Sequence, residues 1–213
     1  MTFHFDDGVV QIKKLEVGPY GNNCFIVVSA QSKECVIIDT PAEPEKVLNE
    51  LEGLKVKVIF ITHNHFDHLT GFQIIKESTG ASVACHKEDA DKLPSPPDIV
   101  LSGGEAIPIG VLTMDVIHTP GHTSGSTCYL AGKHLFSGDT LFPHGPGRTS
   151  SPDNFRQILV SLTQSLFTLP DDVRVYAGHG DDTVLGREKK EYGAFARKGY
   201  ASDLCGDVLW MSD

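Results

Sequence analysis

The chain has 213 residues of ordinary composition and is acidic, with 18 lysine and arginine residues against 28 aspartate and glutamate residues. A chain of this length can bury a core without disulfide bonds. The net charge of -10 argues against nucleic acid as a partner, because binding phosphate groups requires a basic surface. No apolar stretch is long enough to span a bilayer, so we expect no membrane partner.

The five cysteines are scattered along the chain and form no C-x-x-C pair. Their odd number and their spacing argue against a disulfide framework and fit a reducing compartment. The first residues also lack the basic start and the apolar run of a signal peptide. We therefore expect a cytoplasmic protein.

The first half of the chain predicts short strands interspersed with helices. Strands are predicted over residues 9–17, 24–28, 35–38, 55–61 and 81–85. Helices are predicted over residues 43–54, 70–78 and 87–93. The strand over 55–61 ends in an apolar run, which is typical of a buried strand.

The second half begins with strands that are separated by glycine-rich turns, over residues 106–109, 112–117, 126–130 and 134–136. A long helix is predicted over 154–169, with Asp153 as its N-cap and Pro152 just outside it. A strand over 173–176 and a helix over 183–195 follow. Each half is thus a β-rich run followed by helix, strand and polar loop. This order favours an α/β (α+β) fold in which two sheets pack face to face with helices outside, in one domain over residues 1–213.

The densest group of potential metal ligands has the pattern H-x-H-x-D-H and consists of His63, His65, Asp67 and His68. An apolar strand leads into it and an amphipathic segment leads out. Three of the ten histidines fall within these six positions, which a surface loop with chance histidines explains poorly. The pattern therefore indicates a metal site at the end of a strand.

Three further polar loops each follow a short apolar strand, and they contain His122, Asp139 and His179. Each of these residues is flanked by glycine or lies next to one, which lets the backbone turn sharply. Taken alone, each has an ordinary interpretation: a turn histidine, an Asx-turn aspartate and a histidine in a glycine-rich loop. Their common position after a strand favours a shared metal site over three unrelated turns.

These donors number seven, which exceeds the four ligands that one zinc takes. They suit two divalent metal ions that share a bridge, and Asp139 is the natural bridge because a carboxylate offers one oxygen to each ion. Alternate residues of an extended segment point the same way, so His63 and His65 can hold one ion. Imidazole and carboxylate ligands without thiolate suit zinc, our first choice, with iron or manganese as alternatives.

Four residues are predicted to act on the substrate. Asp67 and Asp139 are the candidate catalytic residues, because Asp67 can orient a hydroxide that bridges the two ions. Arg148, in the glycine-rich loop after Asp139, is the candidate for binding an anionic group, and His144 is a candidate for lining the substrate cleft. The remaining histidines are expected to be surface or strand residues: His4, His86, His118 and His134.

The segments 62–68, 119–122, 137–139 and 178–180 resemble, in order, the metal motifs of the metallo-β-lactamase fold superfamily. The resemblance implies a four-layer αββα sandwich with the metals at one edge of the sheets. It also implies that the first metal is held by His63, His65 and His122, and the second by Asp67, His68 and His179, with Asp139 bridging.

Within that superfamily, the chain looks most like the small relatives of glyoxalase II, the hydroxyacylglutathione hydrolases. The resemblance lies in Thr-Pro-Gly-His-Thr-Ser-Gly-Ser, Phe-Ser-Gly-Asp-Thr-Leu-Phe and Tyr-Ala-Gly-His-Gly. It implies a dinuclear hydrolase that acts on a small-molecule acyl thioester, such as a hydroxyacylglutathione, by attack of a metal-bridging hydroxide. The oligomeric state is expected to be a monomer or a homodimer. The chain differs from the large members at Tyr192 to Phe195, where Asn-Pro-Phe is expected.

Three alternatives stay open. The same fold supports a mononuclear iron persulfide dioxygenase, in which His63, His122 and Asp139 would hold one Fe(II). It also supports lactone or phosphodiester hydrolases. A metal-binding module without turnover is the non-enzymatic alternative.

Overall fold

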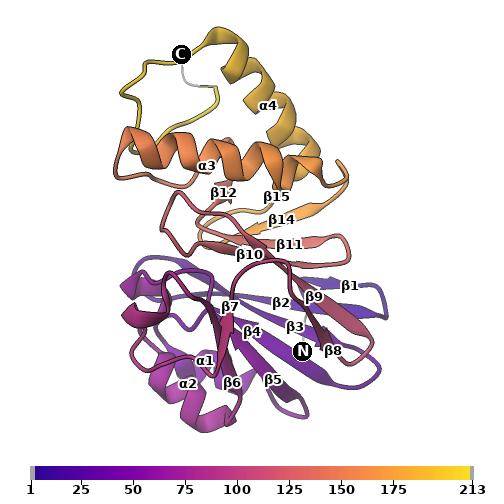
Figure 1. Cartoon of the computed structure of the whole chain (residues 1–213). Helices are drawn as coiled ribbons and strands as arrows, with labels where there is room; N and C mark the ends of the chain where they lie inside the picture. Colours follow the sequence, from indigo (N-terminus) through magenta and orange to yellow (C-terminus); the bar gives the residue numbers. More distant parts are fainter. Residues whose placement is uncertain (1–2, 212–213) are drawn as a thin grey trace.

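A computed structural model describes residues 3–211, which form two β-sheets packed face to face between two layers of helices (Figure 1). The first sheet has seven strands in chain order: β1 (Phe5–Asp6), β2 (Val10–Val17), β3 (Asn22–Ser29), β4 (Glu34–Ile38), β5 (Lys55–Phe60), β6 (Ser82–His86) and β7 (Ile99–Leu101). Helices α1 (Pro44–Asn49) and α2 (Phe72–Thr79) cover its outer face (Figure 1).

The second sheet has six strands, in the order β15 (Thr183–Val184), β14 (Arg174–Ala177), β11 (His134–Gly138), β10 (Thr127–Ala131), β9 (Leu112–His118) and β8 (Ala106–Ile109). Helices α3 (Pro152–Gln164) and α4 (Leu185–Lys198) cover its outer face (Figure 1). A ribbon of β12 (Leu141–Phe142) and β13 (Gly145–Pro146) and three short 3₁₀ helices, η1 (Phe66–His68), η2 (Ala90–Lys92) and η3 (Leu166–Thr168), complete the elements. The expected αββα sandwich is confirmed.

Three apolar clusters hold the layers together. The cluster between the sheets contains Phe25, Phe60 and Phe136, all nearly inaccessible to solvent. The other two lie between each sheet and its helices. Strand β3 is covered on both faces, and all 8 of its residues are buried. That double coverage explains why its sequence is nearly continuous in apolar residues instead of alternating.

Parallel pairing brings the ends of distant strands to one edge of the sandwich. Strand β4 is parallel to β5, and β11 is parallel to β14, so the carboxyl ends of each pair coincide. Two backbone hydrogen bonds then join the sheets at that edge, from Asn23 N to Gly178 O (2.7 Å) and from Thr127 N to Thr62 O (2.9 Å). The loops that carry the predicted metal ligands therefore start from a fixed frame.

The predicted elements agree with the structure in most places and differ at their ends. The helix predicted over 43–54 stops at Asn49, and the helix predicted over 87–93 is only the 3₁₀ helix η2. The helix predicted over 154–169 divides into α3 and η3, and the one over 183–195 begins as strand β15. Strands β1, β7, β12 and β13 were not predicted, because two or three residues are too few to show an alternating pattern.

The N-cap prediction for α3 was wrong by two residues. The cap is Ser151, whose side chain accepts a hydrogen bond from Asn154 N (3.2 Å). Pro152 is the first residue of the helix, where its missing N–H costs nothing. Asp153 instead pairs with Arg156 one turn along the helix. Among residues 3–211, no helix has the length and apolar character needed to cross a membrane.

The cap assignment predicts that Ser151→Ala lowers the free energy of unfolding by about 1 kcal/mol, because the N–H of Asn154 loses its acceptor. Asp153→Ala is the control and should change the stability less, because that side chain is exposed and its ion pair is on the surface. Chemical denaturation of both variants measures the difference. A larger loss in Asp153→Ala than in Ser151→Ala would contradict the assignment.

Candidate metal centre

Four of the seven predicted donors lie in the turn that follows β5. The backbone leaves the sheet after Phe60 and closes into η1, where His68 N donates to His65 O (3.1 Å). His63 and His68 are buried, whereas His65 is exposed and Asp67 is partly exposed. The turn thus places two imidazoles inside the sandwich and two donors towards its surface.

The other three donors come from the second sheet. His122 lies in the turn between β9 and β10, Asp139 directly follows β11, and His179 lies two residues after β14. The chain can turn before Asp139 because Gly138 has a φ of 48°, in the left-handed region. A Cβ atom at Gly138 would also lie 2.6 Å from Thr62 Cβ, so glycine is required on both grounds.

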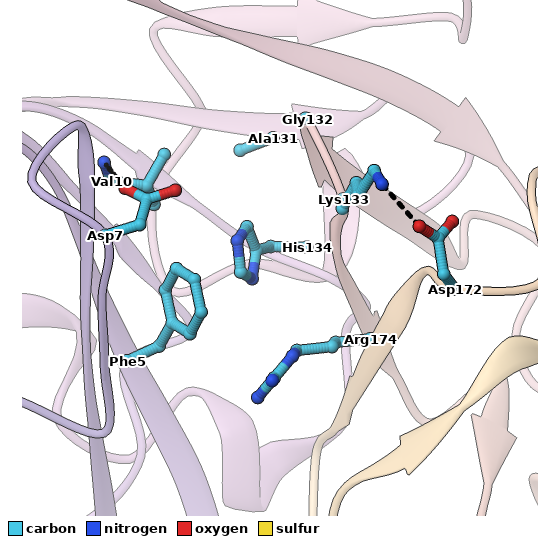
Figure 2. A pocket seen from close by; sticks show the side chains of 9 residues that line it. All are labelled: Phe5, Asp7, Val10, Ala131, Gly132, Lys133, His134, Asp172 and Arg174. Atoms are coloured by element: carbon cyan, nitrogen blue, oxygen red, sulfur yellow. Dashed lines mark hydrogen bonds and ion pairs between the residues drawn. The ribbon is translucent and has the colours of Figure 1, made fainter.

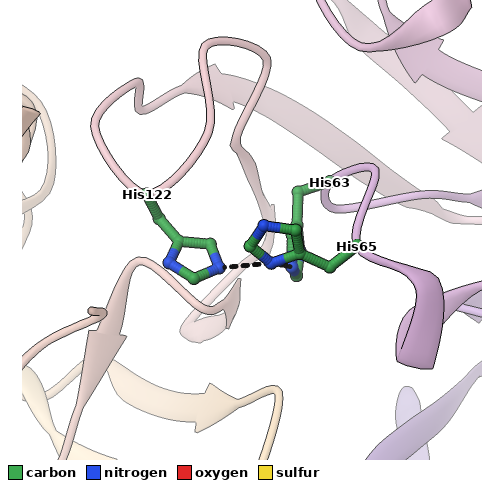
Figure 3. Close-up of side chains that lie close together, drawn as sticks. All are labelled: His63, His65 and His122. Atoms are coloured by element: carbon green, nitrogen blue, oxygen red, sulfur yellow. Dashed lines mark hydrogen bonds between the residues drawn. The ribbon is translucent and has the colours of Figure 1, made fainter. Parts of the chain in front are cut away.

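His63, His65 and His122 converge on one point (Figure 3). His65 Nδ1 lies 3.1 Å from His63 Nε2 and 2.9 Å from His122 Nε2. The three rings come from two loops on different sheets and meet edge to face. Three ring nitrogens at this separation can bind one cation.

Asp67, His68 and His179 form a second group. His179 Nε2 lies 3.2 Å from His68 Nε2 and 3.3 Å from Asp67 Oδ2. Asp139 lies between the two groups, with Oδ1 at 3.5 Å from His68 Nε2 and Oδ2 at 3.5 Å from His122 Nε2. The structure therefore brings all seven predicted donors together and places Asp139 where a bridging ligand would have to be.

In four of the imidazoles, the Nδ1 atom, which points away from the other donors, lies next to an oxygen atom. Thr62 Oγ1 lies 2.9 Å from His63 Nδ1, Asp39 Oδ2 lies 2.8 Å from His68 Nδ1, Arg148 O lies 2.7 Å from His122 Nδ1, and Tyr20 O lies 3.0 Å from His179 Nδ1. An Nδ1–H that donates to such an oxygen leaves Nε2 free to bind a metal. His65 is the exception, because its Nδ1 faces His63 and His122.

Asp39 supports the centre and was missed as a functional residue, since the sequence places it only in the turn after a strand. It is buried, and its carboxylate accepts hydrogen bonds from Thr62 N (2.8 Å) and Thr62 Oγ1 (2.8 Å) as well as from His68. Its φ of 63° is unusual for a residue other than glycine. Its position, a polar residue directly after an apolar strand, is the signal shared by the other donor loops.

Asp89 is the second residue that was missed, and the sequence holds no signal for it. Its carboxylate is fully buried and accepts from Asn64 N (3.0 Å), Thr123 Oγ1 (2.7 Å) and Gly125 N (3.0 Å). Asn64 lies between His63 and His65, and Thr123 follows His122. One carboxylate thus ties together the two loops that supply the first group.

Charge is unevenly distributed in the centre. Burial, together with the neighbouring charge of His68, holds the pKa of His63 well below its ordinary value. Burial by itself also lowers the pKa of His68, but the carboxylates of Asp39 and Asp139 outweigh burial and raise the pKa of His68 well above its ordinary value. Burial also opposes ionisation of Asp139, yet the neighbouring His68 lowers the pKa of Asp139. A protonated His68 thus lies where a cation would lie.

The donors fit divalent metal ions. Asp139 Oδ1 is a buried oxygen without a hydrogen-bond partner, which is costly unless a cation or water meets it. A Cβ at Gly178 would lie 2.3 Å from that oxygen, so a glycine keeps the space beside it open. Imidazole and carboxylate ligands suit zinc, iron or manganese.

The cysteines take no part in the centre. Cys24, Cys35, Cys85 and Cys128 are buried, and burial raises the pKa of each thiol, to about 12 for Cys85 and about 11 for Cys128. A thiol that resists ionisation is a poor ligand and a poor nucleophile. Cys205 is half-buried and lies in the C-terminal segment.

The two predicted substrate-binding residues lie in different surroundings. Arg148 lines both cavities that open from the centre. His144 lines neither of them: its ring lies 2.9 Å from Glu191 Oε2 and 2.8 Å from Arg187 Nη2, both on α4. Its position therefore favours a role in holding the loop against α4 over contact with a substrate.

The other histidines lie away from the donors. A separate cavity at the opposite end of β11 is lined by Phe5, His134 and Arg174, with the Lys133–Asp172 ion pair at its side (Figure 2). His134 is buried there, and its Nδ1 lies 2.9 Å from the Tyr176 hydroxyl. His86 and His118 stack on each other with ring centroids 3.7 Å apart. His4 pairs with Asp182.

A family model described as the metallo-beta-lactamase superfamily matches residues 17–179, a range that contains all seven donors. The chain belongs to the metallo-beta-lactamase superfamily. The resemblance stated from its motifs is thereby confirmed, and membership together with the donor groups supports a metal-dependent hydrolase.

Three proteins are similar to this chain, one in sequence and two in solved structure. Hydroxyacylglutathione hydrolase GloC of Haemophilus influenzae is 28% identical over 204 residues, covering 85% of this chain and 96% of the relative. ETHE1 from Myxococcus xanthus has a TM-score of 0.77 and 31% identity, covering 84% of this chain and 81% of that chain. TTHA1623, solved in a di-iron-bound form, has a TM-score of 0.71 and 30% identity, covering 83% of this chain and 96% of that chain.

The charge distribution predicts that metal binding releases at least one proton near neutral pH. His68 is protonated in the metal-free protein because its pKa is raised, and that proton must leave before Nε2 can bind a metal. Metal affinity should therefore fall as the pH is lowered. Calorimetry in two buffers of different ionisation enthalpy measures the release. Asp39→Asn, which removes a carboxylate beside His68, should reduce it, and an affinity that is constant between pH 6 and 8 would contradict the prediction.

The contacts of Asp89 predict that Asp89→Ala loses metal from the first group before the second. The loops that carry His63, His65 and His122 would lose their common acceptor, so we expect metal affinity at one site to fall about 10- to 100-fold. Equilibrium dialysis at graded free zinc measures both sites. Asp98→Ala is the matched control, because that carboxylate also accepts from a backbone N–H, that of Val83, away from the donors. Equal loss at both sites in Asp89→Ala would argue for general disruption of the fold.

Proposed function

We propose that the protein is a dinuclear metallohydrolase that cleaves small-molecule acyl thioesters, with zinc as its metal and the cytoplasm as its compartment. The observation that carries the proposal is the division of seven donors into two groups with Asp139 between them. The name of the Haemophilus influenzae relative, a hydroxyacylglutathione hydrolase, supports a thioester as the substrate.

In this proposal, His63, His65 and His122 hold one ion, and Asp67, His68 and His179 hold the other. Asp139 belongs to both sites because its carboxylate lies 3.5 Å from His122 Nε2 of the first group and 3.5 Å from His68 Nε2 of the second. These residues would hold two divalent ions, which would lower the pKa of a bound water towards neutrality and polarise a carbonyl oxygen. The protein's own contribution is to fix the geometry of both sites from rigid strand ends.

Asp67 is the residue suited to orient the attacking water, because its carboxylate stays ionised and accepts hydrogen bonds. Partial burial opposes its ionisation, but hydrogen bonds from His179 and Asn22 hold the pKa of Asp67 well below its ordinary value. Asn22 Nδ2 donates to Oδ2 at 2.8 Å, which orients the carboxylate. Water then adds to the acyl carbon, the carbon–sulfur bond breaks, and the thiol leaves with a proton.

Arg148 is the proposed contact for an anionic group on the substrate. Its side chain is largely exposed and lies beside both cavities. Its present partner is Asp207, with Arg148 Nε 3.6 Å from Asp207 Oδ2. Because an exposed pair of this kind is weak, an anionic group could replace Asp207 at little cost.

One observation favours a second candidate, a mononuclear iron persulfide dioxygenase. His63, His68 and Asp139 form a group of two histidines and one carboxylate, the ligand set of many Fe(II) oxygenases. The Fe(II) ligand set predicted from the sequence contains His122 in place of His68. A lactone or a phosphodiester is an alternative substrate for the hydrolase with both sites.

The functional test compares two reactions of protein purified without added metal, after its metal content has been measured. The hydrolase predicts about two equivalents of metal and thiol release from an acyl thioester without oxygen uptake. The dioxygenase predicts one equivalent of iron and oxygen uptake with glutathione persulfide. Metal-loaded protein that is inert towards thioesters, lactones, phosphodiesters and persulfides would refute both.

Asp139→Ala tests the bridge. We expect it to lose bound metal and to reduce kcat/KM by at least about 100-fold, because both sites lose a ligand. Asp115→Ala is the control, since that aspartate is exposed on β9, and it should leave metal content and rate unchanged. Full metal content and full rate in Asp139→Ala would show that the bridge assignment is wrong.

A further inference from the structure

The cavity beside Asp139 is closed on one side by the C-terminal segment. It has a volume of about 350 Å³, which is within the range of small-molecule sites. Three metal-ligand residues, His122, Asp139 and His179, lie on its inner side. The rest of its wall consists of residues from the β12–β13 ribbon and from the C-terminal segment: Phe142, Pro143, Gly145, Pro146, Arg148, Asp207, Val208 and Leu209.

The C-terminal segment is fixed in place on both sides of the cavity. Gly206 and Thr149 exchange two backbone hydrogen bonds, of 2.9 and 3.1 Å. Trp210 N donates to His144 O at 2.7 Å, and the buried indole packs against Tyr192 on α4. Residues 207–209 are therefore held at both ends as a built wall of the cavity.

Close packing also joins the two halves of the wall. A Cβ atom at Gly145 would lie 2.3 Å from Val208 O, so only glycine lets the ribbon meet the segment so closely. Val208 is buried in the apolar cluster under α3 and α4, whereas Leu209 is 56% exposed. Leu209 is thus an apolar side chain that lines the cavity and is open to solvent.

Apart from the three predicted metal ligands on its inner side, the wall is apolar except for one ion pair. Arg148 and Asp207 lie at its edge, and their opposite charges cancel. The side chains of Phe142, Pro146 and Leu209 offer hydrocarbon surface and no hydrogen-bonding group. Burial of a hydrocarbon group against this surface is favourable, whereas a polar group would find no hydrogen-bonding partner among these side chains.

A second cavity opens from the centre on the other side of Arg148. It is lined by His65, His122, Thr149, Ser150, Cys205 and Gly206. Its lining includes two hydroxyl groups and no large apolar side chain, so it is more polar than the first cavity. Since both cavities reach His122, a molecule whose reacting carbonyl lies at the metals can extend one arm into each.

We propose that the cavity between the β12–β13 ribbon and residues 207–209 is a subsite for a hydrocarbon arm of the substrate, and that Leu209 determines its specificity. This proposal depends on the proposed function only in taking the reacting group to be a thioester. The hydrocarbon arm belongs either to the acyl group or to the thiol of a thioester. The two series of thioesters described below distinguish these possibilities.

The experiment measures kcat/KM of the metal-loaded protein for two series of thioesters. One series lengthens the acyl chain from acetyl to octanoyl on one thiol, and the other lengthens an alkyl thiol on one acetyl group. In one series, kcat/KM should rise about three- to fourfold per methylene until the cavity is filled. The series that shows the rise identifies the arm, and a flat response in both series would overturn the proposal.

Leu209→Asp should remove that dependence, so that kcat/KM no longer rises with chain length. Val111→Asp is the matched control, because Val111 is 57% exposed, like Leu209 at 56%, and lies in the turn between β8 and β9. It should keep the full dependence. Leu209→Ala, which adds no charge, should weaken the preference for the longest thioester several-fold. Retention of the full dependence in both Leu209 variants would refute the role of this residue.

A binding measurement separates failure of the subsite from failure of the proposed function. Calorimetry of straight-chain carboxylates from butanoate to decanoate on the metal-loaded protein needs no turnover. Affinity that rises with chain length in the wild type and not in Leu209→Asp supports the subsite even if no thioester is cleaved. Thioester cleavage with no effect of chain length on rate or on affinity refutes the subsite and leaves the hydrolase intact.

Discussion

The buried carboxylate of Asp39 is the contact on which the arrangement of the centre depends. It lies at the end of β4, and because β4 and β5 are parallel neighbours it meets the loop after β5 directly. Two of its hydrogen bonds fix Thr62, and the third fixes the ring of His68. A backbone in the left-handed region costs a non-glycine residue of order 1 kcal/mol, which these bonds offset.

The two halves of the centre are aligned by backbone contacts across the sandwich. Thr62 O accepts from Thr127 N, and Gly178 O accepts from Asn23 N, so each sheet donates to a ligand loop of the other. Side chains then refine this alignment: Asp89 joins the loops of the first group, and Asn22 orients Asp67 in the second. Donors that are far apart in the chain therefore meet on this frame, and the carboxylates of Asp39 and Asp139 raise the pKa of His68.

Much of this centre could be predicted from the sequence because each donor follows a short apolar strand. That local signal located all seven donors and the layers of the fold. Asp89 could not be found in this way, since its three contacts lie 25 to 36 residues away along the chain and its own segment was predicted only as a short helix. For His144, the position in the sequence and the position in the structure suggest different surroundings. Proximity to Asp139 in sequence suggested the cleft, but a φ of 69° at His144 and its contact with Glu191 place the ring against α4.

The burial of the cysteines has a consequence for sulfur chemistry. Four of the five thiols lie in the apolar clusters, where the absence of water keeps them protonated. Only a thiolate exchanges with a disulfide, so the interior cannot form mixed disulfides with sulfur compounds that reach the protein. For a protein proposed to release thiols at every turnover, a disulfide formed by later oxidation of that product would meet no thiolate in the core.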